Sequence, residues 1–146
     1  MIYNRKNVAA IIDHTLLKAD ATEKDIISCC EEGKEYGFAS VCIHPCYVNL
    51  AAKILKGSGV KVATVVGFPM GANLTSVKAF EAARAVEDGA DELDMVLNIG
   101  ALKQGNADYV EADVRAVVKA AGRAVVKVIL ETCYLTDEEK ILACKL

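Results

Sequence analysis

Five short apolar runs alternate with helical patterns along this 146-residue chain, and that alternation restricts its fold more than any other feature. The runs lie at residues 8–12, 39–43, 60–66, 91–96 and 125–130. A strand followed by a helix and then another strand indicates a parallel sheet with right-handed crossover connections. The sequence therefore predicts an α/β protein of five βα units, with no linker or low-complexity segment between them.

Capping residues and glycines predict where several helices begin and end. Thr22, with Asp25 three positions later, is typical of a capping box, and Gly37 ends the helix that this box begins. Thr136 starts a second capping box, with Glu139 in the third position. Between the fourth strand and the helix that follows it, the glycines at 100 and 105 predict a loop.

Two architectures accommodate five βα units in this length. One is an open five-stranded flavodoxin-like sheet, and the other is a truncated (β/α)8 TIM barrel, since eight units take roughly 250 residues. Central strands of an open sheet are covered on both faces and read as continuous apolar runs. Here four runs carry polar residues on one face only, near the strand ends where barrel enzymes hold their chemistry. We therefore expect residues 1–146 to form a single partial TIM-barrel domain with strands one to five and their helices.

The run from Asp91 to Val96 places two carboxylates on one face of a strand. Side chains alternate along a strand, so Glu92 and Asp94 share a face and the apolar residues at 93 and 95 share the other. Buried charges need partners, and Lys127 on the next strand is the natural one. We expect Asp94 and Lys127 to face a common interior, with Asp94 as a general acid or base. An ion pair that only sets strand register is the alternative.

Several further side chains are candidates for chemistry. Lys127 can serve as the counter-ion of Asp94, which we favour, or as an amine nucleophile. Cys42 lies at the end of the second strand and is a candidate thiol, although an inert strand cysteine is the commoner case. His14 and His44 also follow strands, so they are candidate proton shuttles or ordinary loop histidines.

The cysteines do not predict a metal site or disulfides. The spacing Cys42-x-His44-x-Cys46 has no second group of ligands to accompany it, so we expect no metal. Cys29 and Cys30 are adjacent, and the sequence contains no Cys-x-x-Cys pair. Reduced thiols that pack as small apolar side chains are the expected state of all six cysteines.

Charge and hydropathy exclude some classes of partner. A net charge of −3 with both signs interspersed argues against a nucleic acid or an anionic membrane surface as a partner. No apolar run approaches the roughly 20 residues of a membrane-spanning helix. The first residues lack the apolar segment of a signal peptide, so a cytoplasmic location is expected.

Five stretches, in order along the whole chain, resemble the 2-deoxyribose-5-phosphate aldolases, a class I aldolase family on a (β/α)8 barrel. The stretches are residues 12–17 (IDHTLL), 41–45 (VCIHP), 65–71 (VVGFPMG), 89–96 (GADELDMV) and 127–132 (KVILET). The resemblance implies a lyase of deoxyribose phosphate catabolism. Such an enzyme cleaves 2-deoxyribose 5-phosphate reversibly to acetaldehyde and glyceraldehyde 3-phosphate through a Schiff base, without a metal or organic cofactor.

The resemblance also implies roles for particular residues. Asp94 matches the aspartate of the family's proton relay, and Asp13 and Thr15 match residues that hold the water or hydroxyl through which it works. Cys42 matches a thiol near the substrate cavity, and Lys127 an interior polar strand residue. The Schiff-base lysine of the family lies in a Lys-Thr-Ser-Thr-Gly-like stretch on the sixth strand, which this sequence lacks.

The family's second lysine, on strand seven, and its later phosphate-binding loops are also absent from this sequence. The resemblance therefore implies a chain that is inactive on its own. Without strands six to eight, the first and fifth strands are unpaired edges, and such edges drive association. We expect a homo-oligomer formed through these edges. A non-catalytic self-associating half-barrel and a flavodoxin-like binding module remain as alternative functions.

Overall fold

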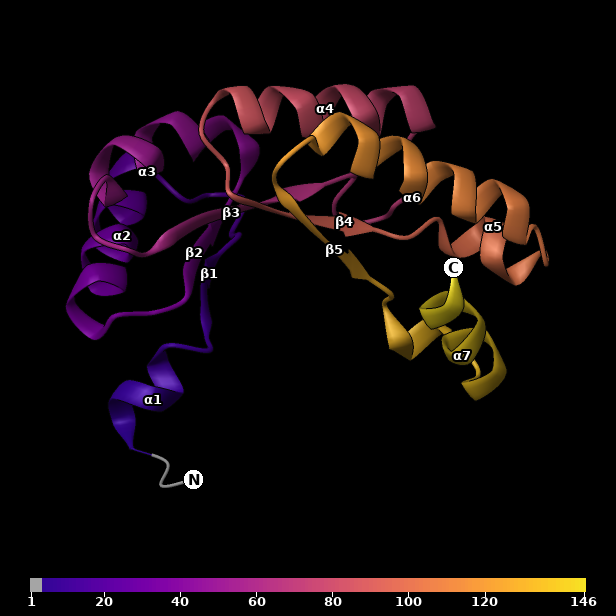
Figure 1. Ribbon diagram of the computed structural model, residues 1–146, viewed down its shortest axis with the longest axis horizontal. Coiled ribbons are helices and arrows are strands. Elements are labelled where there is room, and N and C mark those ends of the chain that lie inside the picture. Colours follow the sequence, from indigo (N-terminus) through magenta and orange to yellow (C-terminus); the bar gives the residue numbers. More distant parts are fainter. Residues whose placement is uncertain (1–3) are drawn as a thin grey trace. The chain divides into compact units, whose positions relative to one another are not determined.

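The computed structural model describes residues 4–146 and shows strands and helices in alternation (Figure 1). The sheet has the strand order β1-β2-β3-β4-β5, and both β1–β2 and β2–β3 pair in parallel. A flavodoxin-like sheet has the order 2-1-3-4-5, so that alternative is wrong. The strands are β1 (Asp13–Leu16), β2 (Ser40–Ile43), β3 (Lys61–Val66), β4 (Glu92–Val96) and β5 (Val125–Ile129).

Helices connect the consecutive strands, as parallel pairing requires. No helix in the described part of the chain is both long and apolar enough to cross a membrane. Two short 3-10 turns, Pro45–Tyr47 and Thr132–Tyr134, follow β2 and β5. The helices are α1 (Arg5–Ala9), α2 (Glu23–Tyr36), α3 (Val48–Leu55), α4 (Thr75–Glu87), α5 (Ile99–Lys103), α6 (Ala107–Ala121) and α7 (Asp137–Lys145).

Both predicted capping boxes are confirmed. The Thr22 N–H donates to the Asp25 carboxylate over 2.8 Å at the start of α2, and the helix ends at Gly37 in the left-handed conformation, φ +66°. At the start of α7 the Thr136 N–H donates to Glu139 Oε2 over 2.8 Å, and the Glu139 N–H donates back to the Thr136 hydroxyl. Local side-chain chemistry therefore sets these helix starts.

Two predictions of local structure are wrong, and an asparagine cap explains each. Residues 8–12 were expected to form the first strand, but α1 covers Arg5–Ala9 and β1 begins only at Asp13. The Asn4 side chain accepts from the N–H of residue 7 over 2.9 Å and so starts α1. The loop expected around residues 100 and 105 contains α5, which the Asn98 side chain caps in the same way.

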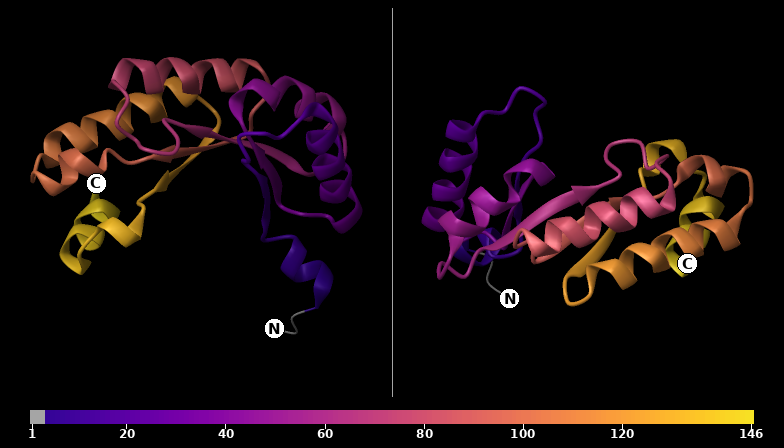
Figure 2. Two further views of the ribbon diagram at one scale, coloured as in Figure 1. Left: turned by 180° about the vertical axis from the view of Figure 1, so that it is seen from behind. Right: turned by 90° about the horizontal axis from the view of Figure 1, so that it is seen from above.

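The chain divides into two compact units. The first holds residues up to Thr64 together with Ala85–Glu92. In it, α2 packs against β1, β2 and α3, and Figure 2 shows α2 and α3 side by side in both views. Ile26 and Val48 are fully buried there. In this unit, helix α2 therefore covers one face of β1 and β2.

The second unit holds Val65–Arg84 and Leu93–Leu146. The helices α5, α6 and α7 each contribute to a hydrophobic cluster that begins at the end of β4. The buried members of this cluster are Leu97, Leu102, Val110, Leu135 and Ala143. The expectation of one domain over residues 1–146 stays a prediction.

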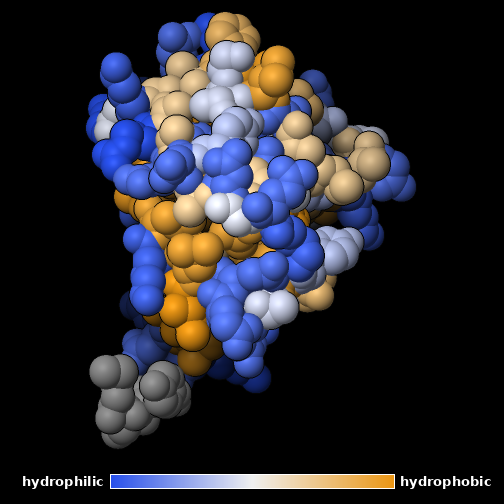
Figure 3. All heavy atoms as spheres, turned by 90° about the vertical axis from the view of Figure 1, so that its right-hand side faces the viewer, coloured by the Kyte–Doolittle hydropathy of each residue, from blue (hydrophilic) through white to orange (hydrophobic). Residues whose placement is uncertain are grey.

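Large hydrophobic side chains also lie at the surface of the described chain. Ile11, Met70, Leu74 and Phe80 are each at least two-thirds exposed. On the face drawn in Figure 3, hydrophobic side chains gather between hydrophilic ones. Large exposed apolar patches are typical of surfaces that bind another molecule or segment.

Candidate active site

Strand β4 presents its carboxylates as the alternation predicts. Leu93 and Met95 are fully buried on one face, whereas Glu92 and Asp94 on the other face are only partly buried. Glu92 forms an ion pair with Lys61, whose Nζ lies 2.8 Å from Glu92 Oε1. The second carboxylate of β4 has a different partner.

Asp94 and Lys127 are brought together from neighbouring strands β4 and β5. Their Oδ1 and Nζ atoms lie 3.0 Å apart, and the side chains are 16% and 38% exposed, respectively. A backbone hydrogen bond fixes the strands next to this pair, because the Leu97 N–H donates to the Ile129 carbonyl over 3.0 Å. A partly exposed carboxylate in contact with an ammonium group can exchange a proton with a bound molecule.

Asp13, Thr15 and Cys42 lie together in the first unit. The β1–β2 register places Asp13 opposite Ser40 and Thr15 opposite Cys42, so these four side chains share a face of the sheet. The Ser40 hydroxyl donates to Asp13 Oδ1 over 2.6 Å, and Cys42 is buried. The structure thus forms two polar groups, one on β1 and β2 and one on β4 and β5.

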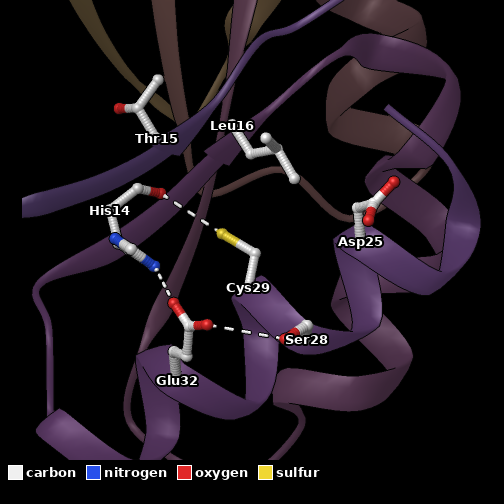
Figure 4. Close-up of a pocket in the computed structure, with 7 residues that line it drawn as sticks. All are labelled: His14, Thr15, Leu16, Asp25, Ser28, Cys29 and Glu32. Atoms are coloured by element: carbon white, nitrogen blue, oxygen red, sulfur yellow. Dashed lines mark hydrogen bonds and ion pairs between the residues drawn. The ribbon is translucent and has the colours of Figure 1, made fainter. Parts of the chain in front are cut away.

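His14 lies on the opposite face of β1, against α2. Its Nε2 is 2.7 Å from Glu32 Oε2, and its ring stacks on Phe38 with the centroids 4.7 Å apart. A cavity of about 260 Å³ lies here between β1 and α2, and Figure 4 shows the Thr15 side chain directed away from the His14 ring. This histidine is therefore placed away from the Asp13 and Thr15 face, and the structure does not support the proton-shuttle hypothesis for it.

The second histidine follows β2. The Nε2 atom of His44 is buried and has no hydrogen-bond partner among the described residues. Within residues 4–146 no cluster of three or more histidine, cysteine and carboxylate side chains is arranged to hold a metal ion. Nε2 of His44 therefore donates to and accepts from neither of the two polar groups.

All six cysteines are free thiols. Burial raises the pKa of Cys29 to about 11 and that of Cys30 to about 11, so both stay protonated near neutral pH. A hydrogen bond to Glu131 raises the pKa of Cys133 as well. The thiolate is the reactive form of cysteine, so these three thiols are poor nucleophiles.

Lys78 of α4 and Asp113 of α6 form a second acid–base pair, which was not predicted from the sequence. The Nζ of Lys78 lies 2.6 Å from Asp113 Oδ2, and both side chains are fully buried. A signal was present in the sequence. Lys78 stands one turn before Ala82 on the buried stripe of α4, and Asp113 stands between Val110 and Val117 on that of α6.

The sequence and fold have clear relatives. Residues 7–141 match the DeoC/LacD family aldolase. The chain is 62% identical over 141 residues to a protein of Geobacillus sp. (strain WCH70) named deoxyribose-phosphate aldolase, covering 96% of this chain and 63% of that one. It is 61% identical over 144 residues to one of the same name from Clostridium kluyveri, covering 98% and 66%. The chain thus spans about two-thirds of the length of these relatives.

Solved structures show the same relationship. A protein from Coccidioides immitis superposes with a TM-score of 0.95 at 46% identity, over 98% of this chain and 56% of that one. A tetrameric deoxyribose phosphate aldolase from Aeropyrum pernix gives a TM-score of 0.84 at 33% identity, over 97% and 60%. With the parallel, unclosed five-stranded sheet, these likenesses confirm the predicted fold class, a partial (β/α)8 TIM barrel of five βα units. The chain belongs to the DeoC/LacD family of aldolases.

Proposed function

We propose that this chain is the part of a deoxyribose-phosphate aldolase that supplies the proton relay. The observation that carries the proposal is the contact of 3.0 Å between Asp94 and Lys127, whose side chains are 16% and 38% exposed, in a chain 62% identical to a protein of that name. The reaction is the reversible aldol cleavage of 2-deoxy-D-ribose 5-phosphate to acetaldehyde and glyceraldehyde 3-phosphate. The chain acts as a lyase only when the remaining barrel strands accompany it.

In the proposed reaction, some catalytic groups come from this chain and others from the remaining barrel strands. A lysine outside residues 1–146 condenses with the sugar carbonyl to give a Schiff base and water. Asp94 then removes the proton of the hydroxyl next to the carbon–carbon bond that breaks, and the electron pair of that bond moves into the Schiff base. Lys127, whose Nζ lies 3.0 Å from Asp94 Oδ1, acts as the counter-ion of this carboxylate. For Asp13, Thr15 and Cys42 of the first unit the proposal assigns roles toward the substrate, with Asp13 and Thr15 holding water or hydroxyl groups.

The test is an aldol cleavage assay on two proteins. One is the 146-residue chain, and the other is the same chain joined to the remaining part of the Geobacillus relative. We expect activity only in the joined protein. There Asp94→Asn should lower kcat by a factor of about 10² to 10⁴, the usual contribution of a general acid or base.

A matched variant and a trapping experiment complete this test. Asp108→Asn removes an exposed carboxylate in the first turn of α6 and should leave kcat unchanged. Sodium borohydride with acetaldehyde should give no adduct on Lys127, the role of which is electrostatic. An inactive joined protein, or full activity of its Asp94→Asn variant, would overturn the proposal.

A second candidate function is self-association without catalysis. It is supported by the edge positions of β1 and β5 and by exposed Ile11, Met70, Leu74 and Phe80. In this case the chain is a homo-oligomer at micromolar concentration, and size-exclusion chromatography with light scattering measures its mass. A well-folded monomer would contradict it. A sugar phosphate as the ligand, a cytoplasmic location and the absence of nucleic-acid or membrane partners remain predictions.

A further inference from the structure

In the buried pair of Lys78 and Asp113, the lysine contacts both the aspartate and the backbone of β4. Lys78 Nζ donates to Asp113 Oδ2 over 2.6 Å and to the Val96 carbonyl over 3.0 Å. The Thr75 hydroxyl donates to the other carboxylate oxygen, Asp113 Oδ1, over 2.8 Å. Both carboxylate oxygens are thus occupied, and the ammonium group is held in one place.

This arrangement fixes one peptide unit from two sides. The carbonyl of Val96 accepts from Lys78, and the N–H of the same peptide, on Leu97, donates to the Ile129 carbonyl over 3.0 Å. Lys78 therefore supplies from a helix the donor that a neighbouring strand would otherwise give. The last peptide of β4 cannot slide along β5 without breaking a buried charge-assisted hydrogen bond.

The peptide held in this way lies next to the candidate catalytic pair. Asp94 and Val96 lie on one face of β4, two residues apart, and Lys127 and Ile129 are spaced in the same way on β5. The hydrogen bond from Leu97 to Ile129 and the contact from Asp94 to Lys127 therefore depend on the same register. A slip of one residue would turn one of the two side chains to the opposite face.

The same helix face also holds the end of β3. The carboxylate of Glu81, three residues beyond Lys78 on α4, accepts from the Gly67 N–H over 2.8 Å. A Cβ atom at Gly67 would lie 2.9 Å from Cε of Lys78, so the loop packs directly on the lysine stem. Thr75, Lys78 and Glu81 recur at intervals of three residues and form one polar face of α4.

We propose that Lys78, held by Asp113, is a positioning residue that fixes the register of β4 against β5 and keeps Asp94 in contact with Lys127. This inference rests on the proposed function of that pair. Stability alone does not account for Lys78 and Asp113, because apolar side chains of similar volume in place of a buried ion pair are often neutral or stabilising. Lys78→Met removes the N–H donor of the hydrogen bond that the Val96 carbonyl accepts.

The test compares local protection with global stability. In Lys78→Met/Asp113→Leu, the urea midpoint should stay near that of the wild type. Hydrogen exchange of the Leu97 amide should accelerate about 10- to 100-fold, the loss expected for one charge-assisted hydrogen bond. The Ala39 amide, which donates to Ile12 in the first unit, is the control and should be unchanged. An unchanged Leu97 rate in the folded double variant would overturn the inference.

A milder variant keeps the inference testable if the double variant does not fold. Thr75→Val removes only the hydroxyl that holds Asp113 and should accelerate Leu97 exchange about 3- to 10-fold. An unchanged rate in this variant counts equally against the inference.

The joined protein described above separates the two proposals. If it is inactive, the proposed function fails while the exchange result stands. If it is active and the double variant retains the wild-type kcat, the positioning role fails while the function stands.

Discussion

Two acid–base pairs in the second unit have the same chemical groups and opposite surroundings. Lys78 and Asp113 are 0% and 1% exposed with a contact of 2.6 Å, whereas Lys127 and Asp94 are 38% and 16% exposed with a contact of 3.0 Å. In the buried pair both carboxylate oxygens have partners, Lys78 and Thr75. The first pair is closed to other molecules, and the second is open to them.

The difference shows that burial decides whether a charged pair can contact other molecules or only stabilises the fold. A charge without water must be compensated by fixed partners, because desolvation otherwise costs several kcal/mol per ion. A pair with such partners cannot exchange a proton with a substrate, since no substrate atom can reach it. A partly exposed pair keeps both the neighbouring charge and the access to other molecules. The pair of Asp94 and Lys127 meets both conditions, as the proposed proton relay requires.

The largest effect should follow from breaking the closed pair. Lys78→Met leaves the Asp113 carboxylate buried without its cation, and the expected loss is about 3–5 kcal/mol of unfolding free energy. Urea denaturation followed by circular dichroism measures it. Lys119→Met, at an exposed lysine in the last turn of α6, is the control and should change little. A loss below about 1 kcal/mol, the range of surface ion pairs, would remove the distinction between the two pairs.

The second-largest effect should come from a variant that presses on the Lys78 side chain and so tests whether that side chain can move. Gly67→Ala forces a side chain into φ +64° and places its Cβ 2.9 Å from Cε of Lys78. Left-handed backbone costs about 1–2 kcal/mol and overpacking about 1–3 kcal/mol, so a loss of roughly 2–4 kcal/mol is expected. Gly105→Ala, at φ +74° with no atom within 4 Å, has the backbone cost alone. Equal losses in the two variants would mean that the Lys78 stem moves aside freely.

Much of the fold could be predicted from the sequence because its signals are local. The capping boxes at Thr22 and Thr136 and the left-handed Gly37 each act within one helical turn. The contact of Asp94 with Lys127 also follows from local rules, since alternation sets the face and consecutive parallel strands are neighbours. These features need no knowledge of distant packing.

The features that the sequence analysis missed depend on packing or on weak caps. Lys78 and Asp113 lie 35 residues apart, and only helix packing shows that each compensates the other. Residues 8–12 are apolar enough for a strand, yet the cap at Asn4 and the placement of β1 at Asp13 favour a helix there.

A smaller effect concerns a third kind of carboxylate, Glu139, which lies partly exposed in the first turn of α7. Hydrogen bonds from the Thr136 N–H and from Lys103 hold the pKa of Glu139 below its ordinary value of 4.5. A lowered folded-state pKa stabilises the protein above 4.5 and loses that contribution as pH falls through the folded value.

A single variant tests this contribution. Glu139→Gln should reduce the thermal midpoint at pH 7 and leave it unchanged near pH 3, and a constant difference between these two pH values would contradict the assignment.

The smallest change in unfolding free energy should follow from breaking the open pair of Asp94 and Lys127. Lys127→Met removes an ammonium group that water already solvates in part, so the loss should be about 0.2–1 kcal/mol. Salt should screen this contribution, because the pair is open to solvent, and 1 M sodium chloride should reduce the difference between wild type and variant. The same salt should leave the cost of Lys78→Met unchanged. A Lys127→Met loss as large as that of Lys78→Met would show that the open pair is structural, and would contradict the proposed role of Asp94 in the proton relay.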